Sequence, residues 1–328
     1  MDNKLAKLIE LVKQLPEYVL DDAITYVEAK INEYTNEKPN PPCPHCKTDK
    51  VKRFGRTSNR QRYRCNECKK TFMETTNTIM EHSQCGEAAW KQVIRDTVDG
   101  VPLEKTSESL HMSHSTAFNM RHKILLALEA EEKRKPTVFD GICELDDTFV
   151  LESYKGSKLP EDFWRKPRKH GAVAQKRGLS NEYLCISTGV QREGASYSRT
   201  VTRGNPGKDD INSVYEGRIS KESLIICDGA KGYASLGESC GCPVVNVDED
   251  KGFAHVNTAN SFHSFIKDRY VKYKGVSTKY LNRYNTLFSN TFRNSASLID
   301  KIYELLCAND IPRHHSIKDV RSLNLLNI

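Results

Sequence analysis

The chain has 328 residues, of which 38% are hydrophobic and 28% are charged. This length accommodates two or three domains with at least one sizeable core, and the composition fits a soluble globular protein. No stretch approaches the 18 or more apolar residues of a membrane span, and the N-terminus lacks the apolar segment of a signal peptide. We therefore expect a cytoplasmic protein with no membrane partner. The net charge of +7 is unevenly distributed, which favours a polyanionic partner.

Residues 1–38 predict a helical hairpin. Apolar residues follow helical spacing up to Leu15, Pro16 interrupts the pattern, and the pattern resumes from Tyr18 to Tyr34. The spacing leaves open whether the hairpin packs on a neighbouring domain or makes protein contacts, including dimer contacts.

Residues 39–78 predict a zinc ribbon. Cys43-Pro-His-Cys46 and Cys65-Asn-Glu-Cys68 form two close pairs separated by 18 residues. Tetrahedral thiolate coordination of Zn²⁺ needs two such pairs, which come from separate hairpins. Residues 51–56 and 61–65 read as strands of a small sheet. His45 is not needed as a ligand because four cysteines complete the coordination shell, and the cysteines elsewhere read as reduced core thiols.

Basic side chains crowd this small module more densely than an ordinary solvated face, which indicates contact with phosphates. They are Lys50, Lys52, Arg53, Arg56, Arg60, Arg62 and Arg64.

Residues 79–135 predict a helix-turn-helix DNA-binding region. Residues 87–98 form a helix that Gly100 ends, residues 102–110 form a short second helix, and Ser113 caps a third. A plain helical bundle between two domains remains the alternative. Side chains of the third helix expected to be exposed and to reach DNA are Ser115, Asn119, Arg121 and His122.

Residues 136–300 predict an α/β domain whose centre is the strand Glu144–Val150. Asp146 and Asp147 on this strand point to opposite faces, and alternation alone does not choose between them. A second strand, residues 224–227, runs directly into Asp228. Carboxylates on neighbouring strand ends form a binding pair for a hard divalent cation, so we interpret this pair as the active centre.

The order of elements in this domain is that of a ribonuclease-H-like sheet. Strands at residues 183–190 and 195–202 and a helix at residues 209–218 precede the strand that ends at Asp228. Between the strand Glu144–Val150 and the strand at residues 183–190, residues 164–178 carry six Lys or Arg and no acid. We interpret this segment as a mobile loop over a nucleic-acid backbone, with a solvated charge run as the alternative. Its candidate contacts are Arg165, Lys166, Arg168 and Lys169.

A helix that begins near Asn257 carries the third candidate position. Asn260 and Lys267 lie two turns apart and share one face, where an amide oxygen and an ammonium suit a metal and a phosphate. Taken alone, an Asn near a helix start is more often a cap, and Asn257 or Thr258 is the expected cap of this helix. Residues 301–328 are expected to hold the end of a further helix and a polar tail.

These motifs occur in a recognisable order. Zinc ribbon, helix-turn-helix, Glu-Leu-Asp-Asp-Thr-Phe, Cys-Asp-Gly-Ala-Lys-Gly-Tyr and His-Val-Asn-Thr-Ala-Asn with a trailing Lys resemble the bacterial insertion-sequence transposases of the DDE class. The match spans about residues 40–295 and is most similar to the zinc-ribbon group of insertion-sequence family fifteen ninety-five, in which some members have Asn where others have Glu. The resemblance implies that the acids are Asp146, rather than Asp147, and Asp228, that Asn260 is the third position, and that Lys267 completes the set.

The resemblance further implies a transposase that cuts element ends and joins them to target DNA by two-metal phosphoryl transfer with Mg²⁺ or Mn²⁺. In this scheme Asp146 bridges both ions, while Asp228 and Asn260 hold one each. Its partners would be the terminal inverted repeats, target DNA in the nucleoid and a second copy of the chain. Asn260 contributes one negative charge fewer than Glu would. This leaves open a zinc-ribbon DNA-binding regulator with an inactive core and, as a weaker reading, a nuclease that cuts without joining.

Overall fold

The computed structural model describes residues 40–57, 60–159, 161, 163, 165–166, 174, 178, 180–229, 231–247, 252–293, 298–308, 317–323 and 325–326. The chain divides into two compact units, residues 1–74 and residues 75–328. The predicted helical hairpin lies outside the described residues. Within the described part of the chain, none of the helices combines the length and apolar character that crossing a bilayer demands.

The first unit contains a three-stranded antiparallel sheet in the order β1-β2-β3. β1 (Val51–Thr57) and β2 (Arg60–Cys65) match the predicted strands to within one residue, and the two-residue β3 (Thr71–Phe72) was not predicted. Tyr63 and Phe72 stack with ring centroids 5.6 Å apart and form the core with Val51 and two cysteines. A core this small gives little hydrophobic stabilisation, so the unit depends on its cysteines.

Three helices open the second unit: α3 (Glu87–Asp99), α4 (Leu103–Ser109) and α5 (His114–Arg134). They form where the sequence predicts them. Gly100 ends α3 in the left-handed conformation (φ 81°), which glycine adopts without steric cost, and the Ser113 hydroxyl accepts the Thr116 N–H to cap α5.

The prediction of a polar tail at the C-terminus is only partly correct. Residues Ile317–Ser322 form a short helix, α11, whose Val320 is fully buried.

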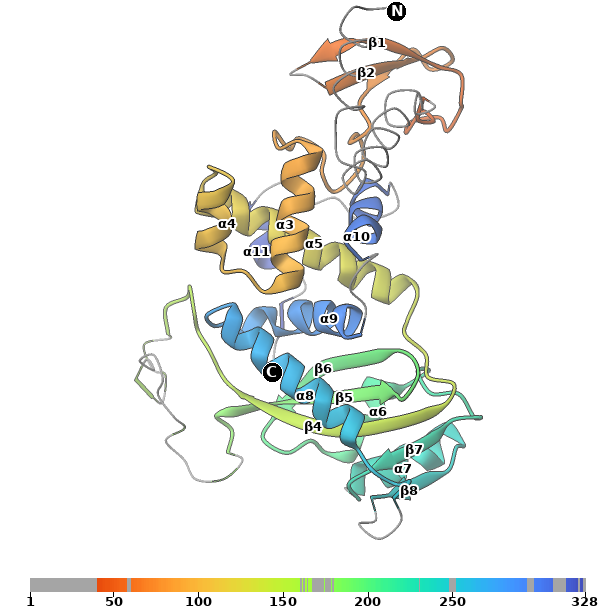
Figure 1. Ribbon diagram of the computed structural model, residues 1–328, viewed down its shortest axis with the longest axis vertical. Coiled ribbons are helices and arrows are strands. Elements are labelled where there is room, and N and C mark those ends of the chain that lie inside the picture. Colours follow the sequence, from red (N-terminus) through yellow and green to blue (C-terminus); the bar gives the residue numbers. More distant parts are fainter. Residues whose placement is uncertain are drawn as a thin grey trace, which may run out of the picture. The chain divides into compact units, whose positions relative to one another are not determined.

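A five-stranded sheet follows in the order β6-β5-β4-β7-β8 (Figure 1). β4 pairs antiparallel with β5 and parallel with β7, and β8 runs parallel to β7. The strands are β4 (Ile142–Leu151), β5 (Tyr183–Gln191), β6 (Ser196–Arg203), β7 (Leu224–Cys227) and β8 (Val244–Asn246).

Different helices cover the two faces of this sheet. Cys143 and Leu145 of β4 pack in one hydrophobic core with α6 (Lys208–Tyr215) and α7 (Lys231–Cys240). The alternate residues of β4 face α8, which crosses β4 and β5 (Figure 1). A second core joins α8 (Asn257–Lys272) and α9 (Leu281–Thr291) to α3, α5 and α10 (Leu298–Cys307). Neither α7 nor β8 was predicted from the sequence.

Candidate active site

The parallel register of β4 and β7 brings Asp146 and Asp228 side by side. Leu145 is paired with Cys227, so the next positions along the two strands are Asp146 and Asp228. Burial raises the pKa of Asp146 to about 6, against the lowering effect of the Asp147 N–H, and the negative charge of Asp228 adds to the rise. A carboxylate whose ionisation is opposed by a neighbouring carboxylate forms with it a suitable donor pair for a hard divalent cation.

Asp147 lies on the other face of β4, in a network of hydroxyl groups. The Tyr233 hydroxyl of α7 donates to Asp147 Oδ1 at 2.8 Å, and Ser187 Oγ lies 3.2 Å from the Tyr233 hydroxyl. Burial raises the pKa of Asp147 and the Tyr233 hydrogen bond lowers it. The Asp147 carboxylate is thus already bound within the protein, on the face of β4 opposite to that of Asp146.

Glu144 is a part of the site that the sequence reasoning missed. Its side chain is fully buried on the same face of β4 as Asp146, and its Oε2 accepts the N–H groups of Thr258 at 2.7 Å and Ala259 at 3.1 Å. α8 has no cap from its own residues, so the expectation that Asn257 or Thr258 caps it is wrong. Glu144 caps it from the sheet, which a carboxylate does well at the positive end of a helix.

This cap fixes the first turn of α8 to the strand that carries Asp146. Arg192 Nε donates to Glu144 Oε1 at 2.7 Å and pairs the buried charge. Asn260 lies in that first turn and is exposed, while Phe262 and Ile266 are buried on the side of the sheet. Glu144 of β4, paired with Arg192 just after β5, therefore positions the first turn of α8, in which Asn260 lies.

Lys267 lies two turns further along α8, and its side chain is exposed. Its positive charge lowers the pKa of Asp146, although the burial of that carboxylate has the larger, opposite effect. The structure thus brings the predicted Lys267 into the electrostatic field of Asp146.

His263, between Asn260 and Lys267, was also missed. Its Nε2 lies 2.6 Å from Thr188 Oγ1, and the Thr188 hydroxyl donates to the carbonyl of Asp146 at 2.8 Å. Since the Thr188 proton is used in that bond, we assign the His263 proton to Nε2, which donates to Thr188. Burial, with a smaller effect of Lys267, lowers the pKa of His263 to about 4, so the ring is neutral. Its position three residues after Asn260, about one helical turn, was the feature of the sequence that could have identified it.

The four cysteines of the first unit form a compact cluster. Their sulfur atoms all lie within 4.8 Å of one another, with 3.6 Å between Cys43 and Cys68 and 3.5 Å between Cys46 and Cys65. Four sulfurs about 2.3 Å from a central Zn²⁺ stand roughly 3.8 Å apart in a tetrahedron, so the cluster fits that ion. Burial opposes ionisation of Cys65, but the N–H groups of Cys68 and Glu67 lower its pKa to about 7, which favours a thiolate ligand.

Basic groups of this unit surround an exposed aromatic ring. The guanidinium groups of Arg62 and Arg64 lie 5.8 and 5.3 Å from the centroid of Phe54, a residue that is 40% exposed. Arg53 and Arg56 are exposed and Arg62 is half-buried, so all three are accessible to a phosphate backbone.

Two predicted DNA contacts need correction. Arg121 and His122 are each only 1% exposed, so the prediction that they project from α5 is wrong. The Arg121 guanidinium donates to the Val101 carbonyl at 2.6 Å and ties α5 to the turn before α4. Ser115 is exposed, as predicted, and Asn119 is half-buried.

The basic segment after β4 is also only partly as expected. Arg165 is 7% exposed, and its guanidinium lies 3.5 Å from Glu152 Oε2 in a buried ion pair. It therefore supports the protein core and does not extend toward DNA. Lys166 is exposed, whereas Arg168 and Lys169 lie outside the described residues.

A family match covers the sheet of the second unit and helices α6 to α9. Residues 139–293 match the ISXO2-like transposase domain. An uncharacterized protein in transposable element ISH50 of Halobacterium salinarum is 24% identical over 252 residues, which cover 75% of this chain and 83% of the relative.

Solved structures give weaker matches. A chain of the simian T-cell lymphotropic virus intasome in complex with PP2A regulatory subunit B56 gamma aligns over 69% of this chain and 77% of its own, with 11% identity and a TM-score of 0.31. A chain of the pre-cleavage Mos1 transpososome aligns over 70% and 81%, with 12% identity and a TM-score of 0.24. Scores this low do not establish a common fold.

Proposed function

We propose that the chain is a DNA transposase that cuts the ends of its element and joins them to target DNA, because residues 139–293 match the ISXO2-like transposase domain. The match supports the predicted resemblance to insertion-sequence family fifteen ninety-five. The observation that carries the proposal is the β4–β7 register, which sets Asp146 beside Asp228 at the end of the sheet over which α8 begins.

The order β6-β5-β4-β7-β8, with three antiparallel strands followed by two parallel ones, supports the assignment of residues 136–300 to a ribonuclease-H-like domain. We assign residues 39–78 to a zinc ribbon and residues 79–135 to a helix-turn-helix region. The compact unit that ends at residue 74 agrees with this arrangement to within a few residues. Residues 1–38 and 301–328 flank these domains.

In this proposal Asp146 and Asp228 hold the catalytic metal, with the amide oxygen of Asn260 as a third ligand. Oxygen donors of this kind suit Mg²⁺ or Mn²⁺, which keep several waters and substrate oxygens as further ligands. When bound, the metal supplies activation of the attacking oxygen and stabilisation of the leaving oxygen. Lys267 contacts a phosphate as a point charge. Glu144 and His263 position these groups, Glu144 through the first turn of α8 and His263 through Thr188.

DNA binding is assigned to the basic side chains that the structure leaves accessible. In the zinc ribbon these include Arg53, Arg56 and Arg62, supported by Zn²⁺ on the four cysteines, and in the catalytic domain they include Lys166. Terminal inverted repeats and target DNA are the proposed ligands, which places the protein at the nucleoid in the cytoplasm. A homodimer would hold the two ends of one element together.

A catalytically inactive DNA-binding regulator is the second candidate, and the specific observation in its favour is Asn260. Its neutral amide binds a divalent cation more weakly than a third carboxylate would. The two functions differ in outcome, because a regulator occupies its DNA without metal-dependent nicking.

The test is a joining assay with the inverted repeats that flank the coding sequence, target DNA and Mg²⁺ or Mn²⁺. We expect Asp146→Ala and Asp228→Ala each to lower joining by at least about 100-fold, since even partners behind the metal ligands are worth 10–100-fold. Asp209→Ala is the matched control, because Asp209 is exposed on α6. Wild-type joining by both variants would refute the assignment, and site occupancy with no nicking by the unaltered protein would favour the regulator.

A further inference from the structure

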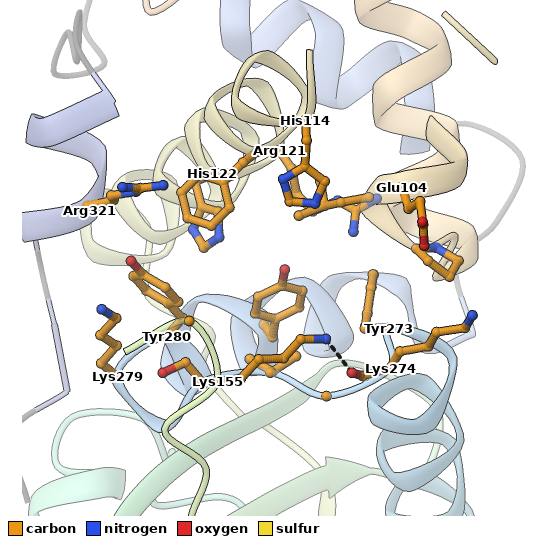
Figure 2. A pocket seen from close by; sticks show the side chains of 18 residues that line it. Glu104, His114, Arg121, His122, Lys155, Tyr273, Lys274, Lys279, Tyr280 and Arg321 are labelled. Carbon is orange, nitrogen blue, oxygen red and sulfur yellow. Dashed lines mark hydrogen bonds between the residues drawn. The ribbon is translucent and has the colours of Figure 1, made fainter. Parts of the chain in front are cut away.

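The second unit contains a pocket of about 410 Å³ (Figure 2), and none of the acidic-site residues Asp146, Asp228, Asn260 and Lys267 is among those that line it. It lies between α4 and α5 on one side and the segment from Tyr273 to Tyr284 on the other, with Lys155 and Arg321 from two further segments. Its charged lining side chains are mostly basic: Arg121, Lys155, Lys274, Lys279 and Arg321, with His114 and His122 beside them. Among the described residues that line it, only Glu104 is acidic. The pocket is therefore electrostatically suited to an anion.

Two of the lysines that line this pocket, Lys155 and Lys279, are bound to neutral oxygens. Lys155 donates to the carbonyl of Lys274, and Lys279 donates to Ser157 Oγ at 3.0 Å. Burial lowers the pKa of Lys155, and the charge of Lys274 lowers it further. Burial likewise lowers the pKa of Lys279, together with the charge of Arg321. A ligand phosphate would relieve this repulsion between cations.

Aromatic rings lie beside these cations. The guanidinium of Arg321 lies 5.3 Å from the centroid of Phe118, and the ammonium of Lys279 lies 5.1 Å from that of Tyr280. The rings of Phe118 and Tyr280 are in edge contact, with centroids 6.0 Å apart. Both rings line the pocket beside these cations, and a nucleotide combines an aromatic base with a phosphate. The volume also lies in the range of about 300–1,000 Å³ that small-molecule ligands occupy, more than one phosphate fills.

The walls of the pocket are anchored before any ligand arrives. Arg283 of α9 is fully buried, lies 2.8 Å from His122 Nδ1 of α5 and donates to the Val320 carbonyl of α11 at 2.9 Å. This arrangement fixes α11, which carries Arg321, against the two helices. On the opposite side, the Ser153 N–H donates to Thr278 Oγ1 at 2.8 Å and holds the Lys155 segment near Lys279. A preformed site loses little conformational entropy on binding.

We propose that this pocket binds one nucleotide unit, with its phosphate beside Lys155, Lys279 and Arg321 and its base against Phe118 and Tyr280. The unit is either an unpaired nucleotide of a DNA strand or a free nucleotide. The first source rests on the proposed transposase function, because the strand would come from the DNA being processed, whereas the second does not.

The experiment measures binding to the full-length, zinc-loaded protein with no Mg²⁺ or Mn²⁺ added. The probes are fluorescein-labelled short oligothymidylate, the same strand in a duplex, and thymidine 5′-monophosphate as competitor. Lys155→Ala and Arg321→Ala remove phosphate contacts, and Phe118→Leu removes a stacking surface. The matched controls are Lys158→Ala on the Lys155 segment and Lys318→Ala on α11, because both lysines are exposed and neither lines the pocket.

We expect Lys155→Ala and Arg321→Ala each to weaken nucleotide binding roughly tenfold, as loss of a hydrogen bond to a charged group does. With oligothymidylate, each should also reduce the slope of log affinity against log salt by about 0.7. Phe118→Leu should weaken binding by a similar factor and leave the salt slope unchanged. The controls should match the unaltered protein, and equal thermal melting of all variants would show that folding is intact.

The competitor separates the two sources. If the three pocket variants lose oligothymidylate binding while thymidine 5′-monophosphate does not compete, the ligand is a strand nucleotide. If they lose monophosphate binding as well, the pocket takes a free nucleotide. The proposal is wrong if all three variants bind every probe as the controls do, or if they bind only the duplex more weakly than the controls do. None of these results depends on Asp146 or Asp228, so the proposal stands or fails separately from the transposase activity.

Discussion

The cysteine cluster and the acidic site are assembled over very different distances along the chain. Cys43 and Cys68, at the ends of the cluster, are 25 residues apart, and two local turns bring their sulfurs together. In the acidic site the bond from Ala259 to Glu144 joins residues 115 apart. We therefore expect the first site to depend mainly on a bound metal, and the second on the packing of a whole domain. This contrast predicts which changes abolish one site and leave the other intact.

The largest effect is expected from loss of the cluster. Cys65→Ser, or a zinc chelator, should unfold the first unit, because structural Zn²⁺ supplies about 10–16 kcal/mol in small domains and the hydrophobic core of this unit is small. The second unit should keep its fold, since its cores do not include these cysteines. Hydrogen exchange on the two units measures both outcomes.

Cys307→Ser is the control, because Cys307 is exposed and lies outside the cluster. Loss of protection in both units together, or in neither, would show that the first unit does not depend on its cysteines in this way.

A smaller but still large effect is expected from Glu144→Ala. It removes one partner of a buried ion pair and the cap of α8, and breaking such a pair costs about 3–5 kcal/mol. Glu144→Gln keeps an oxygen acceptor for the Thr258 and Ala259 N–H groups and should lose less. Chemical denaturation measures the free energy of unfolding for each variant.

Glu193→Gln, an exposed change two residues beyond the β5 strand end, is the matched control. If Glu144→Ala unfolds with the same free energy as this control, Glu144 does not hold α8 to the sheet.

The same contrast explains what the sequence could predict. Both CxxC pairs, the helix that ends at Gly100, the Ser113 cap and the strand from Leu224 to Cys227 depend on neighbours in the chain, and the structure has each of them where expected. Alternation along β4 also correctly predicted that Asp146 and Asp147 lie on opposite faces of the strand, although only the family resemblance favoured Asp146 as the metal-binding acid.

The remaining features depend on partners far away in the sequence. Nothing near Glu144 indicates that its carboxylate caps a helix more than a hundred residues later. Arg121 and Arg165 look like surface cations, but each is buried because a carbonyl or a carboxylate from another element meets it. The short strands β3 and β8 form because longer neighbours offer them free edges, a property of the sheet that a local pattern does not contain.

The two faces of β4 give the most direct test of the central claim. Asp146→Asn and Asp147→Asn are changes of equal size on adjacent residues, and joining of terminal-repeat DNA can be measured for each and normalised to the folded fraction. We predict that Asp146→Asn lowers joining by at least about 100-fold. Asp147→Asn should retain joining close to that of the unaltered protein, because an amide oxygen still accepts the Tyr233 hydroxyl. Normal joining by Asp146→Asn with loss in Asp147→Asn would contradict the proposed active site.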